Sequence, residues 1–72
     1  MDREKVSSTN IEEMGYNPSS RTLEVKFCSG RVYQYYDVEP EVYDIMRNSA
    51  SIGKYFGMKI KSNYKWKRVD NE

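Results

Sequence analysis

A chain of 72 residues with one cysteine and no histidine leaves room for a single domain and cannot assemble the usual Cys/His zinc sites. Because histidine is also the commonest general base and the four glycines are scattered, we expect no enzyme, no metal and no cofactor. The N-terminus is charged and polar, and no stretch approaches the roughly 20 apolar residues of a membrane span. With Cys28 as a lone thiol, these features predict a cytoplasmic protein without membrane binding, which we expect to be a monomer.

The net charge of +1 hides a division along the chain. Residues 1–44 carry five basic and nine acidic side chains, whereas residues 45–69 carry seven basic and no acidic ones. Such asymmetry favours a polyanionic partner, although a solvated helix face followed by a basic tail would give the same composition.

The first element in chain order is ambiguous. Residues 9–12, TNIE, have the spacing of a helix capping box, but Gly15 and Pro18 would stop a helix within about two turns. We therefore predict a short strand over residues 11–16, followed by a loop through NPSSR.

The next two elements form a hairpin. Apolar and charged side chains alternate in TLEVKF, and RVYQYYDV is a second β-rich run. A two-residue turn between them would place a glutamine in the core. A three-residue loop that ends on Gly30 instead pairs Val25 with Tyr33. It also pairs Leu23 with Tyr35, so we predict this register because it collects the apolar side chains on one face.

Two helices follow the hairpin. Pro40 suits the first position of a helix through EVYDIMR, and Ser51 can cap a second helix over residues 52–64. Gly53 and Gly57 weaken that second helix, which predicts that they pack closely against a neighbouring element.

The predicted fold is α+β: a small three-stranded antiparallel β-meander with a C-terminal helical hairpin packed on one face. We expect residues 1–5 to be disordered, residues 6–64 to form the domain, and residues 65–72 to be a basic, polar tail or a short final strand. The predicted core consists of Leu23, Val25, Phe27, Tyr33, Tyr35, Val42, Met46, Ile52, Phe56 and Ile60. The two tyrosines could instead present their rings to a ligand, but the core would then be thin for a chain of this length.

Several motifs in a fixed order run through this fold. They are Gly30, Tyr33 and Tyr35, then Val38 and Pro40, then Ser51, Gly53, Tyr55 and Phe56, and finally Ile60 and Tyr64. From Val6 to Tyr64 this arrangement resembles the KTSC domain, which occurs at the C-terminus of some lysyl-tRNA synthetases and in short bacterial and phage proteins. Gly57 departs from the pattern, since we expect asparagine there. The family is described as uncharacterised, and its attachment to a synthetase implies RNA binding.

We interpret the chain as a small non-enzymatic binding module for RNA, either tRNA-like or single-stranded. Alternating rings and cations such as YKWKR suit single strands, because bases stack on rings while lysines neutralise phosphates. The predicted RNA-binding residues are Arg47, Lys59, Lys61, Tyr64, Lys65, Trp66, Lys67 and Arg68. The alternative is a protein-interaction or phage accessory module without nucleic-acid binding, which would use an apolar patch of Met14, Val32 and Tyr36.

Overall fold

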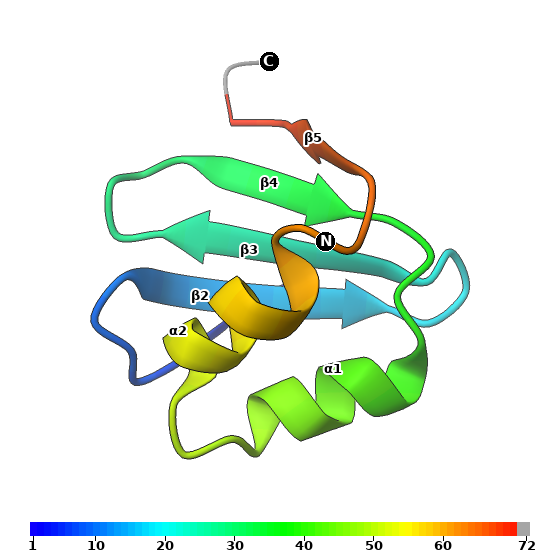
Figure 1. Ribbon diagram of the computed structural model, residues 1–72. Coiled ribbons are helices and arrows are strands. Elements are labelled where there is room, and N and C mark those ends of the chain that lie inside the picture. Colours follow the sequence, from blue (N-terminus) through cyan, green and yellow to red (C-terminus); the bar gives the residue numbers. More distant parts are fainter. Residues whose placement is uncertain (71–72) are drawn as a thin grey trace.

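A computed structural model describes residues 1–70 of the chain. A five-stranded antiparallel sheet, in the order β1-β2-β3-β4-β5, carries a layer of short helices on one face (Figure 1). The strands are β1 (Glu4–Lys5), β2 (Ile11–Asn17), β3 (Thr22–Phe27), β4 (Val32–Tyr35) and β5 (Trp66–Arg68). The helices are α1 (Pro40–Arg47), α2 (Ile52–Tyr55) and the π-helical turn η1 (Phe56–Ile60).

The α+β class and the helical layer on one face are confirmed, but the prediction of three strands is wrong. The two additional strands are the edges of the sheet. Strand β1 lies in the segment predicted to be disordered, and β5 lies in the segment predicted to be a tail or a short final strand. Strands of two or three residues are too short to show an alternating pattern. Side-chain interactions hold them: Arg3 binds Glu13 beside β1, and Asp70 accepts a hydrogen bond from the backbone N–H of Val32 beside β5.

The predicted register of the central hairpin is confirmed. Val25 pairs with Tyr33, and Leu23 pairs with Tyr35. The N–H of Phe27 donates to the carbonyl of Arg31 at 2.9 Å, which closes the three-residue loop. Gly30 ends this loop with φ +96°, a conformation that side chains other than glycine rarely adopt.

The first central strand is extended rather than helical, as predicted. Its pairing with β3 shifts between Ile11 and Glu13, which is the mark of a bulge. The extra residue allows both Ile11 and Met14 to face the helices, although they are three positions apart. Both side chains are completely buried. The proposed exposed patch is therefore wrong for Met14, and it is also wrong for Val32, which is buried as well.

The helical layer follows the predicted order, with one difference in the second helix. Pro40 occupies the first turn of α1, where its missing N–H costs nothing. The second helix ends at Ile60 rather than at residue 64, and its last turn is wider than an α-helical turn. There the N–H of Lys61 donates to the carbonyl of Phe56, five residues earlier, at 3.0 Å.

The core lies between the sheet and the helices. Most of the predicted core residues are buried there: Leu23, Val25, Tyr35, Met46, Ile52, Phe56 and Ile60. The remaining three, Phe27, Tyr33 and Val42, are partly buried and pack against that core. Ile11, Met14 and Val38 add buried side chains that the sequence analysis did not assign to it.

Candidate functional site

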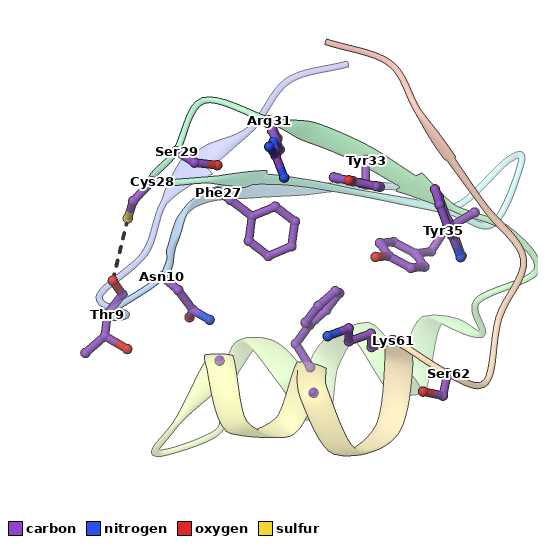
Figure 2. A pocket seen from close by; sticks show the side chains of 14 residues that line it. Thr9, Asn10, Phe27, Cys28, Ser29, Arg31, Tyr33, Tyr35, Lys61 and Ser62 are labelled. Carbon is purple, nitrogen blue, oxygen red and sulfur yellow. Dashed lines mark hydrogen bonds between the residues drawn. The ribbon is translucent and has the colours of Figure 1, made fainter.

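A pocket of about 630 Å³ opens between the β3–β4 hairpin and the helical segment formed by α2 and η1 (Figure 2). Aromatic rings from three different parts of the chain line it: Phe27, Tyr33, Tyr35, Phe56 and Trp66. The strands supply four of these rings, because alternate residues of β3, β4 and β5 point to the helix-covered face. The loop 28–30 and the segment around Thr9 and Asn10 close one end.

Tyr33 lies at the centre of the aromatic cluster. Its ring meets Phe27 edge-on at 5.7 Å between centroids and lies 6.5 Å from the ring of Tyr35. On the third side, the ring of Trp66 is 5.3 Å away. Such contacts fix the ring orientations, so the aromatic surface is present before any ligand binds.

The tyrosine pair of β4 divides between core and pocket. Tyr35 is only 4% exposed, and burial raises the pKa of its hydroxyl to about 12. Tyr33 is partly buried and Trp66 is 56% exposed, so their rings carry most of the accessible aromatic surface. The sequence left core and ligand contact as alternatives for both tyrosines. The structure places Tyr35 in the core, and it places Tyr33 where its ring packs against the core and also lines the pocket.

Two cations border the pocket. Figure 2 shows Arg31 reaching in from the strand side and Lys61 from the helix side. No acidic residue among those described lines the pocket, and neither cation forms an ion pair within residues 1–70. The pocket is therefore aromatic and positively charged, a combination that suits a flat anionic ligand.

The two glycines of the second helix have different surroundings. A Cβ atom on Gly53 would lie 2.6 Å from Oδ1 of Asn10, so this glycine packs closely against a neighbour, as expected. A Cβ atom on Gly57 would meet nothing within 4 Å, so the prediction of close packing is wrong there. Instead, Gly57 leaves the helix wall of the pocket without a side chain.

The structure brings only some of the predicted RNA-binding residues to this pocket. Lys61 and Trp66 line it. Arg68 pairs with Tyr33 across the sheet and so shares its face, although its guanidinium binds Asp70 at 2.7 Å. Lys67 pairs with Gln34, which places it on the opposite face of the sheet.

The remaining predicted residues lie apart from the pocket lining. Arg47 ends α1 and forms an ion pair with Glu4 at 2.8 Å. Lys59 and Lys65 are exposed, and the hydroxyl of Tyr64 donates to Glu39 at 3.1 Å. The pKa of the Glu39 carboxyl is lowered, mainly by a hydrogen bond from its own backbone and to a smaller extent by the bond from Tyr64.

Arg31 is the pocket cation that the sequence analysis missed. The predicted register, which pairs Val25 with Tyr33, pairs Phe27 with Arg31 one step further along the hairpin and so places both on the face of Tyr33. That pairing is the signal that could have identified Arg31, whereas the predicted RNA-binding residues follow the excess of basic residues in the C-terminal half.

Two further findings concern metal binding and membrane spans. Within residues 1–70, no three His, Cys, Asp or Glu side chains gather to hold a metal ion. Over the same residues, every helix is too short or too polar to cross a bilayer.

Comparisons with known proteins agree with this geometry. Residues 7–64 match the model of the KTSC domain. A crystal structure of a KTSC domain protein from Yersinia pestis superimposes with a TM-score of 0.92 at 31% identity, covering 94% of this chain and 96% of that one.

The chain is similar in sequence to two kinds of relative. An uncharacterised protein of Stutzerimonas stutzeri is 35% identical over 97% of this chain and 100% of its own length. A lysine–tRNA ligase of Nostoc punctiforme is 32% identical over 90% of this chain, which corresponds to 12% of the ligase. The chain belongs to the KTSC domain family.

Proposed function

We propose that this protein is a small non-enzymatic module that binds single-stranded RNA or an unpaired region of tRNA. The observation that carries the proposal is the pocket, where the partly buried ring of Tyr33 and the exposed ring of Trp66 lie beside two cations and no acidic side chain among the described residues. Unpaired bases stack on such rings for about 1–3 kcal/mol each, and the cations neutralise phosphates.

The ligase relatives support the same partner. In those proteins a segment like this chain is part of an enzyme named for tRNA. Since the segment is only 12% of each ligase, the likeness supports an accessory role in holding RNA rather than the ligase reaction itself.

The position of the basic residues supports single strands over a duplex. Trp66 is on an edge strand and lines the pocket together with Lys61, and the exposed Lys65 precedes it in the sequence. A continuous duplex keeps its base faces stacked on one another, so it could use the cations but not the rings.

The test is a titration of fluorescently labelled single-stranded RNA and of tRNA, followed by anisotropy at about 50 and 200 mM salt. We expect binding that weakens steeply with salt, and Trp66→Ala should lower the affinity about tenfold. Met58→Ala is the matched control, because Met58 is 65% exposed and lies outside the pocket. The absence of measurable binding at the lower salt concentration would contradict the proposal.

A further inference from the structure

We propose that the pocket is a site for one unpaired nucleotide, with the base against Tyr33 and Trp66 and a phosphate between Arg31 and Lys61. This inference deepens the proposed function and rests on it. It specifies that the pocket takes a single unstacked nucleotide, rather than that the protein merely attracts RNA to a basic surface.

The size of the cavity fits this ligand. A volume of about 630 Å³ lies within the range of roughly 300–1,000 Å³ that is typical of small-molecule sites. The strand side and the helix side face each other across it (Figure 2). A base can therefore enter edge-first between two walls, whereas a flat sheet surface would hold it on one side only.

The rings provide a stacking surface that is already ordered. Tyr33 is tilted against Trp66 by 58° at 5.3 Å, and Phe27 supports it edge-on from the other side. Trp66 remains 56% exposed despite this contact, so much of the indole stays accessible. A base that stacks on this accessible part of the ring would need no rearrangement of the ring cluster.

The two cations fit a phosphate by position and by charge. Arg31 comes from the strand side and Lys61 from the helix side, so their charges converge on the pocket from two directions (Figure 2). Neither is neutralised by an ion pair within the described part of the chain. Arginine and lysine in this arrangement recognise the dianion of a terminal phosphate as well as the monoanion of a phosphodiester.

Gly57 makes room for the base. Since a Cβ atom there would meet nothing within 4 Å, a larger side chain would project into the pocket rather than into the core. Its φ is not positive, so the backbone accepts other residues. Gly57→Leu therefore places a bulky side chain in the pocket of a folded protein, and Gly57→Ala is the matched control that leaves most of the space open.

The experiment uses Trp66 as its probe, because it is the only tryptophan of the chain and a stacked base quenches its fluorescence. The ligands are a single-stranded oligonucleotide of about ten adenylates, AMP, and adenosine. We expect quenching by the oligonucleotide and by AMP, with adenosine binding more weakly than AMP. Gly57→Leu should lower the affinity for the oligonucleotide about tenfold or more, while Gly57→Ala should change it less than about threefold. Circular dichroism and thermal melting establish that both variants are folded.

The phosphate position has its own test. The preference for AMP over adenosine should largely disappear in Lys61→Ala and in Arg31→Ala. Cys28 gives a second readout, because this only cysteine is exposed and lines the pocket. A bound nucleotide should slow its reaction with a thiol reagent.

The outcomes separate the inference from the proposed function. Unchanged RNA binding by Gly57→Leu would overturn the pocket and leave RNA binding by another surface intact. Binding of AMP as tight as that of the oligonucleotide would support the pocket and contradict RNA as the source of the nucleotide. No binding by the unmodified protein would overturn both.

Discussion

The guanidinium of Arg3 binds the carboxylate of Glu24 across Gly15, the residue of β2 that pairs with Glu24. The glycine allows this because the N-terminal segment crosses directly over it. A Cβ atom at this position would lie 2.2 Å from the carbonyl oxygen of Asp2. The edge strand β1 and its ion pair therefore depend on the absence of one side chain.

Gly15→Ala should destabilise the protein, whereas Gly57→Ala should stabilise it. The first substitution pushes against backbone that cannot move without detaching β1, and overpacking of this kind costs about 1–3 kcal/mol. The second adds a methyl group in open space within a helix, where alanine is favoured over glycine by about 1 kcal/mol. Urea unfolding of both variants measures the two free energies, and changes of the same sign would contradict this reading.

Tyr35→Ala should be far more damaging than Tyr33→Ala. Tyr35 is 4% exposed and packs edge-on against Phe56, so its removal should cost about 3–5 kcal/mol. That equals the whole stability of about 3–5 kcal/mol expected for a domain of this size. Tyr33 is only partly buried, and its loss should cost about 1–2 kcal/mol and leave a folded protein.

Thermal melting followed by circular dichroism distinguishes the two tyrosine variants. Tyr36→Ala is the control, because Tyr36 lies on the open face, where its hydroxyl donates to Gln34 at 3.1 Å. Equal losses at positions 33 and 35 would show that the two rings contribute equally to the core.

The hairpin and helices could be predicted from the sequence because their patterns are local. Alternation around Val25 and a glycine at position 30 determine the register, and Pro40 marks the start of α1. The edge strand β1 could not be predicted in this way. The pairing of Glu4 with Met14 depends on a tertiary contact of Arg3 with Glu24 rather than on any pattern within the two-residue strand.

Only part of the pocket could be predicted from the sequence. Trp66 and Lys61 stood out because rings and cations alternate near them. Arg31 lines the same pocket as these two residues only because the second helix packs against the hairpin. The core determines that packing, and no local sequence pattern shows it. The free space over Gly57 is likewise a property of the packed structure, since the sequence gives Gly53 and Gly57 the same appearance.

Acid should loosen β5 only at low pH. The pKa of Asp70 is lowered to about 2 from its ordinary value of 3.8, mainly because Arg68 donates hydrogen bonds to the carboxylate at 2.7 and 3.0 Å. A lowered pKa means that the ionised carboxylate stabilises the folded state. This contribution is complete above about pH 4 and is lost as the pH falls toward about 2.

The emission of Trp66 on the same strand reports this change. We expect a constant spectrum from pH 7 to about pH 4 and a red shift below that range. Asp70→Asn should already be shifted at pH 7 and should show a smaller change in acid. Superimposable curves for the two proteins would mean that Asp70 does not hold the strand.

Lys61→Ala and Lys67→Ala should differ in RNA binding, although they remove the same charge. Lys61 lines the pocket, whereas Lys67 pairs with Gln34 on the opposite face of the sheet. For a single strand, each phosphate contact contributes about 0.7 to the slope of log K against log salt concentration. Lys61→Ala should therefore weaken binding and reduce the slope by about that amount, while Lys67→Ala should leave both nearly unchanged.

Anisotropy titrations at four salt concentrations between about 50 and 200 mM measure the slopes. An equal loss for both variants would indicate a diffuse attraction to the whole protein, and a loss for Lys67→Ala alone would move the binding surface to the open face of the sheet.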